Sequence, residues 1–174
     1  RFEERYTVDL ANNLGNLVSR VSTMIEKYRG GRIATSSLGA GRLATVAAAV
    51  VKSYGESIPR YALHESAAAA FRLIDATNEF IAEAEPWALA REDSASDRLT
   101  QTLFDVAEAT RIIAVLLWPV MPDSCAEILR RAGEPLAPDQ LRLGRDTDWK
   151  ATLDRRFDRG PSLWPRREAH SPPI

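Results

Sequence analysis

Apolar residues recur at intervals of three and four through most of the first 133 residues, and this spacing constrains the fold more than any other feature. Such spacing places side chains on one face of a helix, whereas a half-buried strand needs alternation at every second residue. No segment alternates with period two for long enough to indicate a strand. The sequence therefore predicts an all-α fold, a bundle of about five helices.

The first predicted helix runs from about Phe2 to Tyr28 and ends before the Gly30–Gly31 pair, where positive φ angles become available. Residues 30–40 are rich in Gly, Ser and Thr and indicate a loop. The apolar stripe that should face the core consists of Leu10, Leu14, Leu17, Val21, Met24 and Tyr28.

Two further helices are expected before residue 90. One covers residues 41–54 and should stop at Gly55, and the next runs from about Leu63 to Glu83. Pro86 biases Glu85 away from helical geometry, so Trp87 should follow a helix end and lie on a bend. The expected core face of the second of these helices contains Ala67, Phe71, Ile74, Asn78 and Ile81, with one polar position among them.

A fourth helix should run from about Asp97 to Trp118 with Ser94 or Ser96 as its N-cap, followed by a shorter helix over residues 123–132. The predicted buried face of the helix over residues 97–118 consists of Leu99, Leu103, Val106, Thr110, Ile113 and Leu117. The periodicity fades after Gly133, and residues 134–174 are rich in proline. The chain is thus interpreted as a bundle over residues 1–133 and an irregular extension over 134–174 that packs on it within the same domain.

Composition narrows the function classes. A net charge of −1 does not indicate a broadly basic nucleic-acid binder, so any basic surface must be local. The single cysteine, Cys125, excludes an internal disulfide and a thiolate metal cluster. His64 and His170 have no suitably spaced partners, so neither a metal site nor a catalytic site is expected. Without a membrane-spanning run or signal peptide, the cytoplasm is the expected location, and the absence of an initial Met suggests a piece of a longer protein.

A polar flank of the first predicted helix carries Asn13, Asn16 and Arg20. Asn16 and Arg20 are four residues apart, so their side chains point the same way, about one turn apart. An amide and a guanidinium are planar hydrogen-bonding groups that together can bind the edge of a nucleotide base. A solvated helix flank without a ligand would show the same pattern.

Four segments resemble, in order, the anticodon-binding domain that follows the catalytic domain of methionyl-tRNA synthetases, which are class I aminoacyl-tRNA synthetases. The first is DLANNLGNLVSR at residues 9–20, and the second is NEFI at 78–81 followed by EPWAL at 85–89. The third is residues 111–117 followed by PVMP at 119–122, and the fourth is LWPR at 163–166, where Trp164 replaces the usual Phe. The similarity covers almost the whole chain.

The resemblance implies an anticodon-binding helical bundle that binds the anticodon stem-loop of tRNA(Met). It assigns recognition of the CAU anticodon to Asn16, Arg20 and Trp87, with Trp87 offering a face on which a splayed base can stack. ATP, methionine and any zinc would bind a catalytic domain that this chain lacks; no cofactor is expected here. The chain itself would support methionine–tRNA ligation in protein biosynthesis without catalysing it.

Three alternatives stay open at this point. The chain could instead be a related bundle from another class I synthetase, such as the cysteine or leucine enzyme, which would read different bases. It could also be a helical protein-interaction module without a role in RNA binding. Trp87, finally, could pack as an ordinary core aromatic instead of contacting a ligand.

Overall fold

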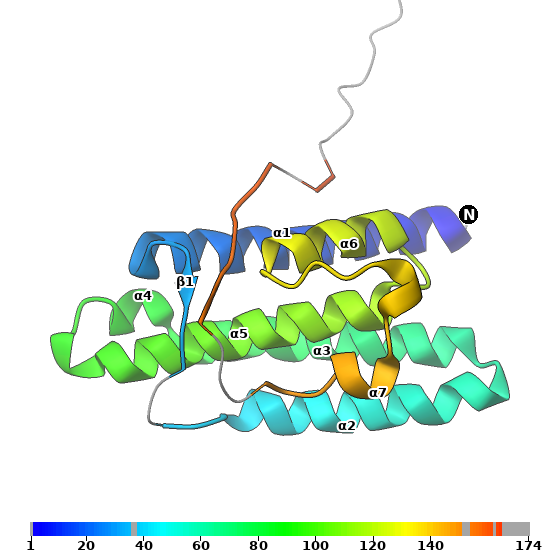
Figure 1. The fold of residues 1–174 in the computed structure, drawn as a ribbon, viewed down its shortest axis with the longest axis horizontal. Helices are drawn as coiled ribbons and strands as arrows, with labels where there is room; N and C mark the ends of the chain where they lie inside the picture. Colours follow the sequence, from blue (N-terminus) through cyan, green and yellow to red (C-terminus); the bar gives the residue numbers. More distant parts are fainter. Residues whose placement is uncertain (1, 36–37, 151–153, 162, 165–174) are drawn as a thin grey trace, which may run out of the picture.

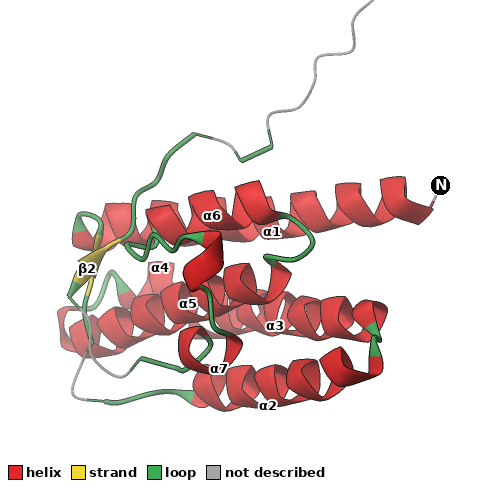
Figure 2. Cartoon of the chain, turned by 45° about the vertical axis from the view of Figure 1, so that its right-hand side comes forward, coloured by secondary structure: helices red, strands yellow, loops and turns green. Residues whose placement is uncertain are grey.

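The computed structural model describes residues 2–35, 38–150, 154–161, 163 and 164, and these residues form a helical bundle. Helices α1 (Phe2–Arg29) and α6 (Pro122–Arg131) lie side by side in one layer, as both Figure 1 and Figure 2 show. Helices α3 (Leu63–Ala84) and α5 (Ser96–Leu117) run through the middle, and α2 (Arg42–Ser57) covers the opposite side. The predicted all-α class is confirmed.

The predicted apolar stripe of α1 faces the core from Leu14 onward, and the side chain of Leu10 lies outside the part of the chain that the structure describes. Leu14, Leu17 and Val21 are fully buried, and Met24 and Tyr28 pack against the core from its edge. The helix ends at Gly30 and Gly31, whose φ angles of 58° and 81° lie in the left-handed region that glycine adopts without strain. The glycine pair therefore ends the helix where the sequence predicted.

Helices α2 and α3 pack against one another, but the predicted end of α2 is wrong. The helix continues through Gly55 to Ser57, since one glycine lowers helix stability by only about 1 kcal/mol relative to alanine. The buried Ser57 hydroxyl contacts the Tyr54 carbonyl at 2.7 Å and the Ser66 hydroxyl at 2.5 Å. A short 3-10 turn, η1 (Ile58–Arg60), then leads to α3.

Helix α5 is the centre of the bundle, and the prediction of its N-cap residue is wrong. Neither Ser94 nor Ser96 caps it: the helix continues from a 3-10 turn, η2 (Asp93–Ala95), with Ala95 at the N-cap position and no side-chain cap. The predicted apolar face is buried, but so is every other side of the helix from Gln101 to Trp118. Neighbours surround α5, so its polar residues had to be buried as well.

The chain after α6 contains short elements that the helical periodicity did not predict. Gly133 follows α6 with a φ of 75°, and the chain then forms η3 (Pro138–Gln140) and α7 (Leu143–Asp146). Strand β2 (Arg155–Arg156) pairs antiparallel with β1 (Arg32–Ile33), so that Arg32 opposes Arg156 and Ile33 opposes Arg155. Period-two alternation cannot reveal strands of two residues, and the expectation of no strand is corrected here. The boundary at residue 133 stays a prediction.

A buried ion-pair network joins α5 to this C-terminal segment. The side chains of Glu108 and Arg111 are both fully buried, and Arg111 Nη2 donates to Glu108 Oε2 at 3.0 Å. Arg111 also donates to the backbone carbonyls of Asp146 and, at 2.6 Å, Asp148. The Lys150 backbone N–H donates to Glu108 Oε2 at 3.1 Å. Three residues of the chain beyond α6 are thereby attached to α5.

Arg155 on β2 completes the network. It donates to Glu108 Oε1 and, at 3.1 Å, to Glu134 Oε1, and Lys150 Nζ pairs with the same Glu134 oxygen. Burial raises the pKa of Glu108, but the Arg111 and Arg155 guanidiniums and the Lys150 N–H outweigh it and hold that pKa below its ordinary value. The carboxylate of Glu108 is therefore ionised in the folded protein.

We expect Arg111→Met to lower the free energy of unfolding by about 3–5 kcal/mol, because it leaves Glu108 incompletely paired and two carbonyls without a donor. The depressed pKa of Glu108 makes its contribution complete above pH 4.5, its ordinary value, and lost as the pH falls further. Urea unfolding at pH 7 measures the first effect. Arg98→Met, an exposed site on α5, is the control and should change stability by no more than about 0.5 kcal/mol. Equal effects of the two substitutions would contradict this account.

A second buried carboxylate on α5 lies at the start of α2. Asp105 is 1% exposed; its Oδ1 accepts a hydrogen bond from Gln101 Nε2 at 2.8 Å, and the Gly41 N–H also donates to this carboxylate. Gly41 is the N-cap residue of α2 and has no side chain to cap the helix. A Cβ there would lie 2.6 Å from Asp105 Oδ2, so glycine is needed for this contact. Asp105 thus caps α2 from a different helix.

Burial raises the pKa of Asp105 to about 6, although the hydrogen bonds from Gln101 and Gly41 oppose the shift. A raised pKa means that ionisation lowers stability as the pH rises from 3.8 through 6. We therefore expect Asp105→Asn to gain stability relative to the parent by up to about 3 kcal/mol between pH 4 and pH 8, at about 1.4 kcal/mol per pKa unit. Urea unfolding at both pH values tests this. Asp97→Asn, at an exposed site, should show no such trend, and a pH-independent difference for Asp105→Asn would refute the assignment.

Candidate nucleic-acid interface

The three polar residues predicted on the flank of α1 lie together at the surface. Asn13, Asn16 and Arg20 are all exposed, on the side of the helix away from its buried stripe. They line a surface hollow of about 430 Å³ between α1 and α3, which we call the α1–α3 hollow; its lining residues are Asn13, Asn16, Ser19, Arg20 and Asn78. The lining is entirely polar and contains no carboxylate. Each lining side chain therefore offers hydrogen-bond donors or acceptors, and none of them suits proton transfer.

Asn78 on α3 holds Arg20 in place. Arg20 Nη1 donates to Asn78 Oδ1 at 3.0 Å, while Asn78 Nδ2 donates to the Ile74 carbonyl one turn earlier in α3 at 3.2 Å. The second bond fixes the orientation of the amide, so its oxygen faces α1. Sequence reasoning placed Asn78 on the core face of its helix and missed this function. The signal was a single polar residue in an otherwise apolar stripe.

Trp87 lies where the sequence predicted, directly after a helix end. Glu85 has a left-handed conformation with a φ of 46°, and Pro86 begins the one-turn helix α4 (Pro86–Leu89), which contains Trp87. The Trp87 side chain is 41% exposed, whereas Pro86 is buried. The alternative of an ordinary core aromatic is therefore wrong. Trp87 does not line the α1–α3 hollow, so the structure brings together Asn16 and Arg20 but shows no contact between them and Trp87.

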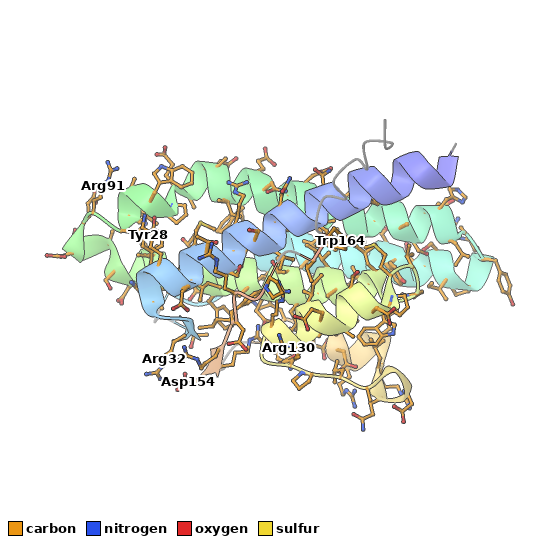
Figure 3. The ribbon with its side chains drawn as sticks, turned by 90° about the horizontal axis from the view of Figure 1, so that it is seen from above. Tyr28, Arg32, Arg91, Arg130, Asp154 and Trp164 are labelled. Carbon is orange, nitrogen blue, oxygen red and sulfur yellow. The ribbon has the colours of Figure 1, made fainter. Side chains whose placement is uncertain are left out.

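The arginines near this surface differ in exposure and in how many hydrogen bonds their guanidinium groups make within the fold. Arg29, at the end of α1, donates to Thr100 Oγ1 at 3.0 and 3.1 Å and to the Ser96 carbonyl at 3.0 Å, so its guanidinium joins α1 to α5. Arg91, just after α4, is exposed at the end of the bundle where Tyr28 also lies (Figure 3). Arg91 and Arg20 are thus exposed, Arg20 with one bond to Asn78, whereas Arg29 is largely used within the fold.

The described residues contain no group of three or more His, Cys, Asp or Glu side chains that could hold a metal ion. The side chain of His64 is 84% exposed and lies beside Glu65, and His170 falls outside the described residues. Across the same described part of the chain, no helix is both long and apolar enough to cross a membrane.

Comparison with known proteins decides the family. No family model matches the chain. It is 31% identical over 175 residues to the methionine–tRNA ligase of Enterococcus faecalis and 33% identical over 174 residues to that of Bacillus subtilis. The alignments cover 96% and 97% of this chain but 25% and 26% of those relatives. The chain belongs to the methionyl-tRNA synthetase family.

Solved structures of methionyl-tRNA synthetase agree with this membership. The Mycobacterium tuberculosis synthetase bound by methionyl-adenylate superposes with a TM-score of 0.80 at 27% identity, over 93% of this chain and 32% of that one. Its free form gives a TM-score of 0.79, also at 27% identity, over 97% and 34% of the two chains. The chain thus spans about a quarter to a third of the synthetases that it matches, and family membership excludes the cysteine and leucine enzymes as alternatives.

The exposure of Trp87 sets an expectation for stability. Trp87→Ala should lower the free energy of unfolding by about 1–2 kcal/mol, because folding buries only part of the Trp87 side chain. Phe104→Ala, at a 1% exposed core position on α5, should cost about 3–5 kcal/mol. Urea unfolding of both variants at one pH makes the comparison. A loss for Trp87→Ala as large as that for Phe104→Ala would contradict this expectation.

Proposed function

We propose that this chain is the tRNA-recognition region of a methionyl-tRNA synthetase and reads the CAU anticodon of tRNA(Met). The observation that carries the proposal is the α1–α3 hollow, which presents an amide and a guanidinium from the same helix face. Family membership supports it, since the relatives are named as methionine–tRNA ligases. Anticodon bases are single-stranded, so they can be splayed out and read on their pairing edges by such groups.

The proposed division of roles follows from the position of each group. Asn16 offers both a donor and an acceptor, and Arg20 offers donors in a fixed fork, so together they can distinguish base edges. Asn78 orients Arg20 before any ligand arrives, which reduces the entropy lost on binding. Trp87 provides an exposed aromatic face, suited to stacking by a base of any type. Edge contacts would then give specificity, while stacking would give affinity.

Catalysis is assigned to a different part of the synthetase. The described residues of this chain show no metal-binding cluster, and the hollow contains no acid or base. A catalytic domain of the same polypeptide would bind ATP, methionine and any zinc, and would attach methionine to the tRNA that this region selects. The methionyl-adenylate in the M. tuberculosis structure is bound by a synthetase about three times as long as this chain. This chain contributes selection rather than chemistry.

The proposal is tested by binding of an RNA stem-loop with a CAU anticodon to the 174-residue chain. We expect Trp87→Ala to weaken binding by about 1–3 kcal/mol through lost stacking, and Trp87→Phe by less. Asn16→Ala and Arg20→Ala should weaken binding and also reduce the preference for CAU over altered anticodons, because they remove edge contacts. Asn78→Ala should act in the same direction as Arg20→Ala but more weakly. Fluorescence anisotropy with the CAU loop and altered loops measures both quantities.

Matched controls separate recognition from general damage. Tyr61 is a 90% exposed aromatic residue in the connection between α2 and α3, at the end of the bundle opposite α4 (Figure 1), so Tyr61→Ala should bind normally. Arg72, exposed on α3 and bonded to Ser53, is the control for Arg20. Normal CAU binding by the Asn16, Arg20 and Trp87 variants would reject the assigned residues. A wild-type chain that bound all loops equally would reject anticodon reading altogether.

A further inference from the structure

A second cavity lies on α1 beside the α1–α3 hollow. It has a volume of about 230 Å³ and is bounded by α1, the end of α6 and residues 159–161, 163 and 164; we call it the Trp164 pocket. Asn16 and Ser19 line both cavities, so the Trp164 pocket and the α1–α3 hollow adjoin one another at these residues. Figure 3 shows Trp164 beside the middle of α1, on the side where α6 lies. A ligand that reached across Asn16 would enter both cavities.

The floor of the pocket is held by close contacts that exist without a ligand. Arg131, whose side chain is 4% exposed, donates to Glu127 Oε1 at 2.7 Å and to the Arg159 carbonyl at 3.0 Å. Gly160 has a φ of 60°, and a Cβ there would lie 2.5 Å from Arg131 Cζ. Only glycine permits this approach, so the chain at residue 160 lies directly on the guanidinium. The pocket is therefore largely preformed.

The opposite wall depends on a glycine inside α1. A Cβ at Gly15 would lie 2.7 Å from Cε3 of the Trp164 ring, closer than real Cβ atoms approach their neighbours. Glycine is a poor helix former, and here its missing side chain makes room for the ring. Gly55, the other glycine within a long helix, has no atom within 4 Å of such a Cβ. Packing against Trp164 thus requires glycine at position 15, whereas no contact requires it at position 55.

The lining chemistry suits a nucleotide. Trp164 supplies an aromatic face, Asn16 and Ser19 supply polar groups, and no acidic side chain lines the pocket. Arg159 is exposed, and its guanidinium has no partner among the residues that the structure describes. The volume falls below the roughly 300–1,000 Å³ of pockets that hold drug-sized ligands, so it admits a single planar group. A base with its phosphate at Arg159 satisfies each of these features.

We propose that the Trp164 pocket binds the nucleobase directly next to the anticodon, on its 5′ or 3′ side, stacked against Trp164 with its phosphate at Arg159. The proposal rests on the proposed function, because the strand must already lie over Asn16. One strand then places a base of the anticodon in the α1–α3 hollow and the flanking base in the Trp164 pocket. Affinity for the loop thereby depends on a nucleotide outside the anticodon.

The test uses the 174-residue chain and three RNA stem-loops with the same CAU anticodon. One loop is intact, the second has an abasic nucleotide directly 5′ of the anticodon, and the third has one directly 3′ of it. The abasic nucleotide at one of the two positions should weaken wild-type binding by about 5- to 150-fold, the range that base–aromatic stacking spans. Gly15→Ala should weaken binding of the intact loop to a similar extent and should remove the sensitivity to that abasic position. Non-additivity of this kind marks two changes that act on one contact.

Gly55→Ala is the matched control, since it adds the same methyl group to a helical glycine in open space, and it should bind every loop as the parent does. Alanine favours the helix at both positions, so α1 should remain folded in Gly15→Ala. Arg159→Gln gives a second variant at an exposed site, and it should weaken binding of the intact loop more than Arg72→Gln does.

The outcomes separate this inference from the proposed function. Preference for CAU over altered anticodons, without an effect of either abasic position, overturns the pocket and leaves anticodon reading intact. Full abasic sensitivity retained in Gly15→Ala also overturns the pocket. A flanking-base effect that Gly15→Ala abolishes, in a chain without CAU preference, supports the pocket and overturns anticodon reading. Failure of the wild-type chain to bind any loop overturns both.

Discussion

The buried pair of Glu108 and Arg111 is the interaction on which the rest of the arrangement depends. Charges this deep in a protein are unfavourable unless each is matched, and here every oxygen of Glu108 and two nitrogens of Arg111 find partners on the segment after α6. The pair thus makes the bundle and its C-terminal segment mutually dependent. Without their partners on Asp146, Asp148, Lys150 and Arg155, the charges at the centre of α5 would be unsatisfied.

This arrangement also leaves the polar flank of α1 exposed. Helix α5 is covered on all sides, so the remaining helices need bury only one face each, and the outer face of α1 keeps Asn13, Asn16 and Arg20 at the surface. The left-handed Glu85 and the following proline have a comparable effect, because they turn the chain out of α3 and leave Trp87 partly exposed. The candidate interface is therefore built on helices α1, α3 and α4, with Asn78 orienting Arg20.

The parts of this structure that sequence reasoning predicted are those set by local physics. The apolar stripe of α1, the glycine pair after it and the proline before Trp87 each act within a few residues, and the structure confirms all three. The failures concern distant partners. Ser96 contacts Arg29 instead of capping its own helix, and Asp105 caps α2 across the bundle. Likewise, the role of Asn78 depends on its hydrogen bond with Arg20 on another helix, which local sequence does not reveal. Strands of two residues are too short to produce a detectable periodicity. The three assigned RNA contacts came from family resemblance and stay predictions.

The pairing of β1 with β2 has a consequence for the order in which the chain can fold during synthesis. Arg32 in β1 and Asp154, directly before β2, are separated by 122 positions in the sequence and form an ion pair at 2.7 Å. At a synthesis rate of about 5–20 residues per second, β1 emerges roughly 6–25 s before its partner. During that interval the helices can form from local contacts, but the completely buried Ile33 has no strand beside it and Glu108 has no Arg155. The nascent bundle is therefore incomplete until Arg155 and Arg156 leave the ribosome, and apolar surface that β2 later covers stays open to aggregation during this interval.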